Sequence, residues 1–264
     1  MIDHKATFDD YLAMPGEHFS SIKEMHRSPA HYRSRVRPAD SDALRLGRAL
    51  HAAILDPSAL SVVQYAGKRA GKQWAAFQRE NEGKLILTPK QAVEVAAMRA
   101  SVRAHPHASR LIRNGRPEVS ATFELDGVPF KSRVDMVAGD GSLVELKSTR
   151  DNHPRQFERE FARRLYHAQM ALYRIGLQAN DIRCQRAYCI TVCKTPPHEV
   201  VVFSVDEETM EAGARLVRDW VARLKECERA RAWPGMDNGA ILTLRIPEWA
   251  ITEGLPDIEG GDDD

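Results

Sequence analysis

The chain reads TFELDGVPFKSRVDMVAGDGSLVELKS from Thr122 to Ser148, where short apolar segments are separated by two turn signals. The first signal is Asp126-Gly127, the kind of dipeptide that most strongly indicates a two-residue hairpin turn. The second is Gly139-Asp140-Gly141. This stretch therefore predicts three adjacent antiparallel strands joined by two turns.

The two turns also predict the register of these strands. Counting outward from the first turn places Glu118 opposite Asp135, and counting from the second places Asp135 opposite Glu145. The second count also places Arg133 opposite Lys147. Opposed side chains emerge on one face about 5 Å apart at Cβ, and alternation adds Lys147 to that face. We therefore expect three carboxylates in a row beside a lysine.

This row of acids needs a source of positive charge, because opposed like charges destabilise a sheet. A divalent cation with hard oxygen ligands, Mg²⁺ or Mn²⁺, would remove the repulsion. Alternatively, the face is solvated, and Lys147 and Arg133 neutralise the acids as cross-strand ion pairs. The alternating residues Val144 and Leu146 are apolar, so this strand has one buried and one ionic face, which favours the metal site.

Around this centre the sequence predicts an α/β fold. A helical N-terminal stretch opens with a Ser21-x-x-Glu24 capping box and is broken by Pro29. Residues 58–88 give no clear pattern. The other expected elements are helices over about 41–55, 89–104, 154–177 and 206–229, and strands over about 184–194 and 199–205.

Composition indicates a soluble globular chain. Of 264 residues, 43% are hydrophobic and 28% charged. We expect a single domain over residues 1–245 with an N-terminal helical part, followed by a tail, 246–264, that is acidic and disordered at its end. No apolar run is long enough to span a membrane, and no signal peptide is recognisable, so the expected location is cytoplasmic.

The net charge of +1 does not by itself indicate a nucleic-acid partner. Basic residues are nevertheless clustered, either as a solvated face or as a track for phosphates. The cluster comprises Arg27, Arg33, Arg35, Arg37, Arg45, Arg48, Lys68, Arg69 and Lys72. The segment Gly67–Lys72 resembles a phosphate-binding loop, but it is one residue short of the Walker spacing and Gln73 follows it, so no ATP site is expected.

The four cysteines, Cys184, Cys189, Cys193 and Cys227, include no Cys-x-x-Cys pair. We expect buried thiols rather than disulfides, with three of them on one strand.

Five motifs occur in an order that resembles the RecB-like branch of the PD-(D/E)XK nucleases, and most closely the RecE-type exonuclease (exodeoxyribonuclease VIII-like) domain. They are Gly47-x-x-x-His51, Glu118, Gly127 through Asp135, Glu145-Leu146-Lys147 and Gln169-x-x-x-Tyr173. Ser28–Tyr32 and Trp233-Pro234-Gly235 add to the resemblance, which covers about residues 15–240. It implies a restriction-endonuclease-like core, a central mixed β-sheet flanked by helices.

The resemblance also implies roles for individual residues. His51 and the Leu146 carbonyl would bind the metal beside Asp135 and Glu145, with Glu118 in or next to the ligand set. Gln169 and Tyr173, one helical turn apart, would touch DNA or orient the catalytic Lys147. Read without the family, His51 is an ordinary helix histidine and the Gln169–Tyr173 pair is amphipathic packing.

Some members of this branch hold an iron–sulfur cluster with four cysteines. Here no cysteine precedes the nuclease core, so no such cluster is expected. Glu145 stands where Asp is commoner, which keeps the carboxylate.

By resemblance, the function is Mg²⁺-dependent 5′ to 3′ exonuclease activity on ends of linear double-stranded DNA, leaving 3′ overhangs for annealing recombination. The resemblance further implies a homo-oligomeric ring, with a tetramer as the first expectation and a trimer as the second, and a RecT-type annealing partner. Arg45, Arg48 and Arg133 are the candidates for gripping DNA. The alternatives are a structure-dependent or single-strand nuclease of the wider branch and a noncatalytic DNA-binding module.

Overall fold

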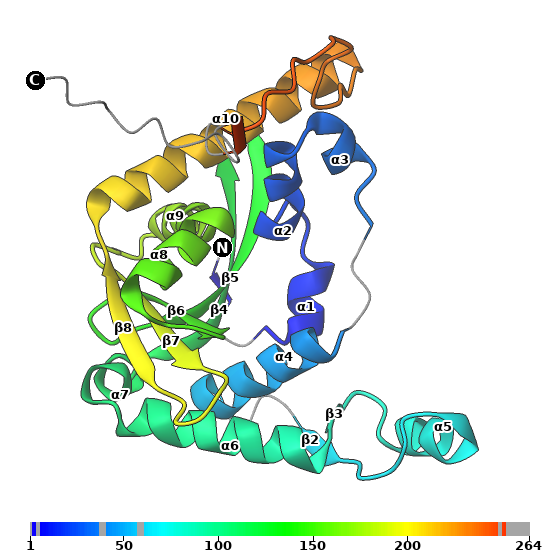
Figure 1. Cartoon of the computed structure of the whole chain (residues 1–264). Helices are drawn as coiled ribbons and strands as arrows, with labels where there is room; N and C mark the ends of the chain where they lie inside the picture. Colours follow the sequence, from blue (N-terminus) through cyan, green and yellow to red (C-terminus); the bar gives the residue numbers. More distant parts are fainter. Residues whose placement is uncertain (1, 4–5, 37–40, 57–60, 248–249, 252–264) are drawn as a thin grey trace, which may run out of the picture.

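The computed structural model describes residues 2–3, 6–36, 41–56, 61–247 and 250–251. Its centre is a six-stranded mixed sheet in the order β1-β4-β5-β6-β7-β8, with helices on both faces (Figure 1). This confirms the α/β fold with a central mixed sheet. Two further strands form a small separate sheet.

The three strands expected from the opening stretch are β4 (Arg116–Leu125), β5 (Val128–Val137) and β6 (Leu143–Thr149). The predicted register of the first hairpin is confirmed at both ends, by Leu125↔Val128 and by Arg116↔Val137. Asp126 and Gly127 both have positive φ, 51° and 82°, as a type I′ turn requires. This turn aligns ten-residue strands and brings Glu118 beside Asp135.

The antiparallel pairs β4–β5 and β5–β6 are each joined by a short turn. Strand β7 (Ala187–Cys193) instead runs parallel to β6 and so requires a long connection. Two helices make it, α8 (Pro154–Arg163) and α9 (Tyr166–Gln178). The single helix expected over residues 154–177 is therefore wrong. Leu165 adopts a left-handed conformation, with φ of 62°, and separates the two helices.

The edges of the sheet are β1 (Ile2–Asp3), antiparallel to β4, and β8 (Val200–Val205), antiparallel to β7. Strand β7 begins three residues later than expected, so Cys184 precedes it instead of lying on it. All four cysteines are free thiols.

One face of the sheet packs on α4 (Asp42–Leu55), α6 (Pro89–Ala104) and α7 (Pro106–Ile112). Their side chains and those of Val144 and Leu146 form one apolar cluster. The opposite face is covered by α8, α9 and α10 (Glu207–Ala230) (Figure 1). Helices α4 and α6 follow the bounds expected from the sequence, and Ser41 caps α4 by accepting from the Leu44 N–H.

The N-terminal helical part consists of α1 (Phe8–Ala13), α2 (Phe19–Ile22), a 3₁₀ turn η1 (Lys23–His26) and α3 (Pro29–Arg33). The expected Ser21–Glu24 capping box is wrong. His18 is the N-cap residue of α2, and Ser21 is its third residue and completes the box from inside the helix. Pro29 does not merely break a helix, because it begins α3 with Ser28 as the cap, a position that its fixed φ suits.

The stretch without a clear pattern contains β2 (Val62–Gln64), α5 (Gly71–Glu80) and β3 (Leu85–Leu87). Strands β2 and β3 pair in parallel. Most of the tail expected to be disordered, residues 248–249 and 252–264, lies outside the described residues. Among the described helices, none is both long and apolar enough to cross a membrane.

Contact between α9 and α10 predicts the effect of one substitution. A Cβ on Gly213 of α10 would lie 2.3 Å from the His167 carbonyl oxygen of α9, so Gly213→Ala should force the helices apart. We expect it to lower the free energy of unfolding by about 1–3 kcal/mol, measured by urea titration.

Gly47→Ala in α4 is the matched control, because its Cβ would meet no described atom within 4 Å. There the gain in helix propensity should leave stability unchanged or raise it by up to about 1 kcal/mol. Equal losses in the two variants would contradict the close α9–α10 contact.

Candidate metal centre

The candidate site lies where strands β5 and β6 separate. Their ladder includes Val137↔Leu143 and ends at Met136↔Val144. Both pairs fit the predicted register, but Asp135 and Glu145 do not continue it as ladder partners. Instead, the Asp135 carboxylate turns into the gap, where its Oδ2 accepts a hydrogen bond of 2.8 Å from the Leu146 N–H. The expected row of three opposed carboxylates is thus replaced by a carboxylate in the gap between two strands.

Strand geometry changes at the same level of the sheet. Val134 packs with the α9 side of the molecule, whereas Met136 packs with the α4 side, so the regular two-residue alternation is interrupted at Asp135. Across the hairpin, Glu118 has a φ of 52°, a conformation that L residues rarely adopt. These two departures leave Asp135 accessible to groups from both faces of the sheet.

The Leu146 backbone also faces this gap. Because the N–H and C=O of one residue point to the same side of a strand, the Leu146 carbonyl is on the side of Asp135, like its N–H. The backbone N–H and C=O groups of Glu145 and Lys147 instead face β7, where these residues are in register with Cys189 and Thr191. The carbonyl expected as a metal ligand therefore lies at the edge of the gap.

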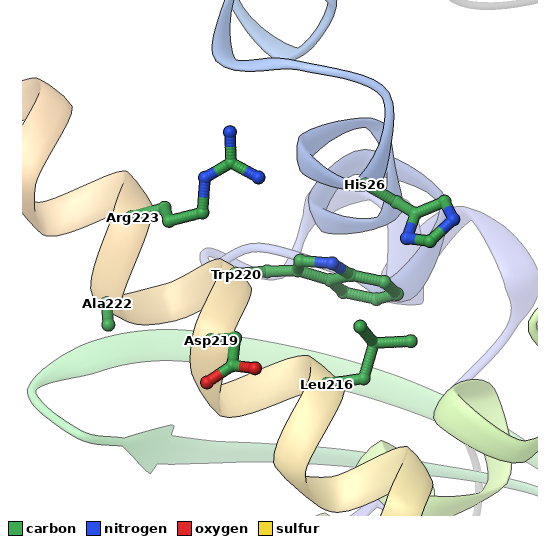
Figure 2. Close-up of a pocket in the computed structure, with 6 residues that line it drawn as sticks. All are labelled: His26, Leu216, Asp219, Trp220, Ala222 and Arg223. Carbon is green, nitrogen blue, oxygen red and sulfur yellow. The ribbon is translucent and has the colours of Figure 1, made fainter. Parts of the chain in front are cut away.

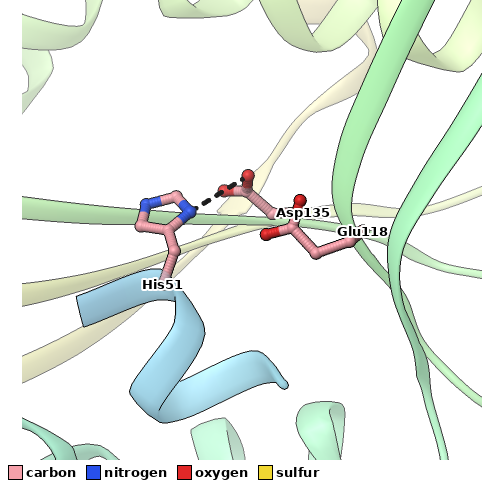
Figure 3. A group of neighbouring side chains, drawn as sticks. All are labelled: His51, Glu118 and Asp135. Carbon is pink, nitrogen blue, oxygen red and sulfur yellow. Dashed lines mark ion pairs between the residues drawn. The ribbon is translucent and has the colours of Figure 1, made fainter. Parts of the chain in front are cut away.

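His51 reaches Asp135 from helix α4. Its Nδ1 is 3.3 Å from Asp135 Oδ1, and Figure 3 shows the imidazole directed at the carboxylate, with Glu118 on the other side. One ligand atom from each of His51, Glu118 and Asp135 lies within 4.8 Å of the others. Three residues from a helix and two strands, far apart in sequence, thus form a compact set of oxygen and nitrogen donors.

Electrostatics within this set are strongly coupled. Burial lowers the pKa of His51, but the adjacent Asp135 carboxylate raises it more, to about 9. Burial raises the pKa of Asp135, but His51 and Lys147 lower it to a net value below the usual range. Burial and the nearby Asp135 raise the pKa of Glu118 despite its ion pair with Arg133. Without a cation, a proton on His51 balances the acids.

Glu145 is almost fully buried, with 1% of its surface exposed. One of its oxygens, Oε1, pairs with the Lys147 ammonium. Among the described residues, its other oxygen, Oε2, is buried and has no hydrogen-bond partner. Burial and Asp135 raise the pKa of Glu145 to about 7. A buried acceptor without a partner costs on the order of 1–3 kcal/mol, so a ligand on this oxygen would relieve a cost that the described residues leave in place.

Lys147 lies between β6 and helix α9. Its Nζ donates to Gln169 Oε1 at 3.3 Å, and the Gln169 amide donates to the Tyr173 hydroxyl at 2.9 Å. Gln169 therefore contacts Lys147, and Tyr173 contacts Gln169, while their roles toward DNA or in orienting the lysine stay predictions. Despite burial, Glu145 and Asp135 raise the pKa of Lys147, which keeps the ammonium charged.

Tyr166 is a residue of the site that sequence reasoning missed. Lys147 Nζ lies 4.7 Å from the centroid of the Tyr166 ring, a distance at which the ring face attracts a cation. Tyr166 is three residues before Gln169 on α9 and hence on the same face, and that spacing was the signal that could have found it.

The arginines expected to contact DNA have other contacts here. Arg133 donates from Nε to Glu118 at 2.6 Å and from Nη1 to the Ala6 carbonyl at 2.9 Å. Arg45 pairs with Asp42, and Arg48 is exposed on α4, one turn before His51. Arg37 lies outside the described residues. Arg133 thus positions Glu118, and its contact with DNA stays a prediction.

The donor set fits a hard divalent cation. It offers carboxylate oxygens from Asp135 and Glu118 and one imidazole close together, with Glu145 and the Leu146 carbonyl as neighbouring oxygens, and these are ligands that Mg²⁺ and Mn²⁺ accept. The unpartnered Glu145 Oε2 is the observation that a cation would explain, since it would satisfy the oxygen and relieve the repulsion with Asp135.

A separate open pocket of about 420 Å³ lies over α10 and η1 (Figure 2). His26 and Trp220 form its wall, with their rings edge to face at 5.9 Å. Its lining contains none of the residues that the sequence singled out, and only Asp219 offers a carboxylate. This pocket therefore does not coincide with the candidate site at the gap between β5 and β6.

Comparison with known proteins agrees with this architecture. Residues 18–243 match the family described as a PDDEXK-like domain of unknown function (DUF3799). No curated protein matches the chain significantly.

Solved structures extend the comparison. A crystal structure from Eubacterium rectale, named "putative exonuclease", superposes with a TM-score of 0.62 at 14% identity, over 95% of this chain and 99% of that one. This likeness shows the fold. A phage-related exonuclease from Haemophilus somnus 129PT has 11% identity and a TM-score of 0.33 over 80% of this chain and 96% of its own, which is too low to support an argument.

Metal binding can be measured directly. We expect Mn²⁺ to bind the wild-type protein in isothermal calorimetry, and Asp135→Asn to weaken this binding by at least tenfold, about 1.4 kcal/mol, because Asp135 lies between His51 and Glu118 in the donor set. Glu17→Gln is the matched control, since Glu17 is a half-buried carboxylate held by Tyr32 and Arg35. Unchanged affinity in Asp135→Asn would show that the gap is not the metal site.

Proposed function

The chain belongs to the PDDEXK-like family DUF3799, and from this premise we propose that it is a metal-dependent nuclease that digests DNA from its ends. The observation that carries the proposal is the gap between β5 and β6. There a carboxylate cluster with an unpartnered buried oxygen adjoins a buried, charged lysine. A structural ion-pair network would satisfy its acceptors, whereas a hydrolytic site keeps one for a ligand.

The proposed metal is Mg²⁺, with Mn²⁺ able to replace it. Asp135, Glu145, His51 and the Leu146 carbonyl would hold it, with Glu118 beside them. When bound, the cation polarises the scissile phosphate and lowers the pKa of water. Oxygen donors dominate the set, which favours these hard ions over softer metals.

Lys147 would act on the reacting phosphate. Its ammonium is held by Glu145, Gln169 and the Tyr166 ring, so its position is fixed before substrate binds. A fixed cation next to the scissile group stabilises the negative charge that develops in the transition state, and it can orient the attacking water. Gln169 and Tyr173 then serve as positioning residues for Lys147.

For the substrate we propose linear double-stranded DNA, degraded 5′ to 3′ to leave 3′ overhangs for annealing recombination. Support for this finer statement is the order of the RecE-type motifs in the sequence. The same resemblance supports a homo-oligomeric ring, a tetramer before a trimer, and a RecT-type annealing partner. Arg45 and Arg48 precede His51 on α4, and we propose them as contacts for the DNA backbone.

Removing the lysine separates catalysis from binding. We expect Lys147→Ala to lower single-turnover hydrolysis of DNA by at least a hundredfold, about 2.7 kcal/mol, while DNA binding and the folded state persist. Lys90→Ala, at an 88% exposed side chain on α6, should retain wild-type rates. If Lys147→Ala cuts DNA as fast as the wild type, the proposed role of Lys147 fails.

The substrate is tested with linear and covalently closed circular forms of one plasmid, incubated side by side with Mg²⁺. An end-dependent enzyme should degrade the linear form and leave the circle intact, as followed on agarose gels. Rapid cutting of the circle would favour a structure-dependent or single-strand nuclease. No Mg²⁺-dependent hydrolysis of any DNA end would leave only the noncatalytic DNA-binding module.

A further inference from the structure

Residues 61–88, which we call the arm, stand out from the rest of the molecule (Figure 1). The arm contains β2, α5 and β3, and α5 has no buried residue. Its base joins the body, where Leu85 and Leu87 pack into the cluster that includes α4 and α6. A projecting helix without a buried side contributes little to the core, so its retention in the fold needs another reason.

The charge of the arm differs from that of the whole chain. Between Ser61 and Thr88 there are five basic and two acidic residues, whereas the complete chain has a net charge of only +1. Both acidic residues come at the end of the segment, after Arg79. The loop before α5 and its first turn therefore contain no acidic residue of their own, and on them Lys68 and Lys72 are exposed, while Arg69 pairs with Asp42 of α4.

An aromatic cluster holds this basic loop in one conformation. The Tyr65 ring lies 5.0 Å from Trp74 and 4.7 Å from Phe77, between centroids, and the Arg69 guanidinium lies 5.6 Å from the Trp74 ring. A Cβ on Gly67 would lie 2.7 Å from the Tyr65 hydroxyl oxygen, so only glycine allows this close packing. The rings are occupied with one another, which leaves the lysines as the groups available to a partner.

The arm is also fixed relative to the candidate metal centre. Arg69 donates to Asp42 at 3.0 Å and to the Ile86 carbonyl at 2.9 Å, which ties the loop to the first residue of α4. His51 lies nine residues further along the same helix, about 14 Å at 1.5 Å per residue. The exposed Arg48 lies between them. One rigid helix thus connects the basic loop with a residue of the site.

We propose that the arm is a docking surface for the phosphate backbone of the duplex whose end occupies the gap between β5 and β6. This inference rests on the proposed function for the identity of the substrate. Lys68 and Lys72 bind phosphates without reading bases, because they offer mobile point charges instead of paired hydrogen-bond donors. The arm thereby binds a part of the duplex that lies away from the cleavage site. It does not contribute to sequence specificity.

The test uses Lys68→Gln/Lys72→Gln in a Lys147→Ala background, with fluorescence anisotropy of a labelled blunt duplex of about 30 base pairs in Mg²⁺. We expect the affinity to fall on the order of tenfold, and the slope of log K against log salt to become shallower by about 1.8, since two phosphate contacts are lost. Circular dichroism and Mn²⁺ binding should stay unchanged.

Arg215→Gln/Arg218→Gln is the matched control. It removes the same charge from exposed positions on α10, on the side of the molecule away from α5 (Figure 1), and should leave affinity and slope unaltered. Equal effects in the two double variants, or no effect in either, would overturn the docking surface.

The experiments distinguish an error in the proposed docking surface from an error in the proposed function. If the arm variant binds DNA as well as its Lys147→Ala parent, and the protein with Lys147 intact digests linear DNA, the nuclease stands and the docking surface falls. If the arm variant loses affinity but no form of the protein cuts DNA, the docking surface stands and the hydrolytic function falls.

Discussion

Two carboxylates, Asp135 and Glu145, are withdrawn from water at the point where two neighbouring strands part, and the surrounding structure compensates that burial. Ionised groups in a protein interior are tolerated only when paired and hydrogen-bonded. Asp135 therefore accepts from the Leu146 backbone and lies against His51, while Glu145 pairs with Lys147. One oxygen of Glu145 stays without a partner among the described residues, beside the group of His51, Glu118 and Asp135 that we propose as the place for a cation.

The connections between the strands bring the side chains that neutralise Asp135 and Glu145 from both faces of the sheet. Because β6 and β7 are parallel, the chain must cross over between them, and this crossover lays α9 above Lys147. The left-handed turn at Leu165 sets where α9 begins, so that Tyr166, Gln169 and Tyr173 share the face turned to the lysine. Helix α4 packs on the opposite face and supplies His51. Such a site requires a gap between strands, since an unbroken ladder would separate the two helices.

Local sequence signals were sufficient to predict most of the strands and helices of the fold. Asp126-Gly127 allows few backbone conformations, so the register of the hairpin that carries Glu118 and Asp135 could be counted from the sequence, and apolar residues at helical spacing predicted the helix over 41–55. The end of the β5–β6 ladder could not be predicted in this way, because strand separation depends on how α4 and α9 compete for space around Asp135. The break between α8 and α9 at Leu165 has the same origin. Both features are decided by tertiary packing, and no turn-forming residue marks them in the sequence.

Net charge was the least informative property of this sequence, for a physical reason. Exposed charges interact over a Debye length of about 8 Å at physiological ionic strength, so a nucleic acid responds to the cations within its reach and not to the total. In this chain many charges cancel locally, as in the Arg133–Glu118 and Arg174–Glu207 pairs. Such pairs leave little field outside the molecule. In the basic loop of the arm, only Arg69 has such an ion pair among the described residues, with Asp42, and the exposed Lys68 and Lys72 keep a local positive charge, so a chain that is nearly neutral as a whole can still present a surface that attracts phosphate.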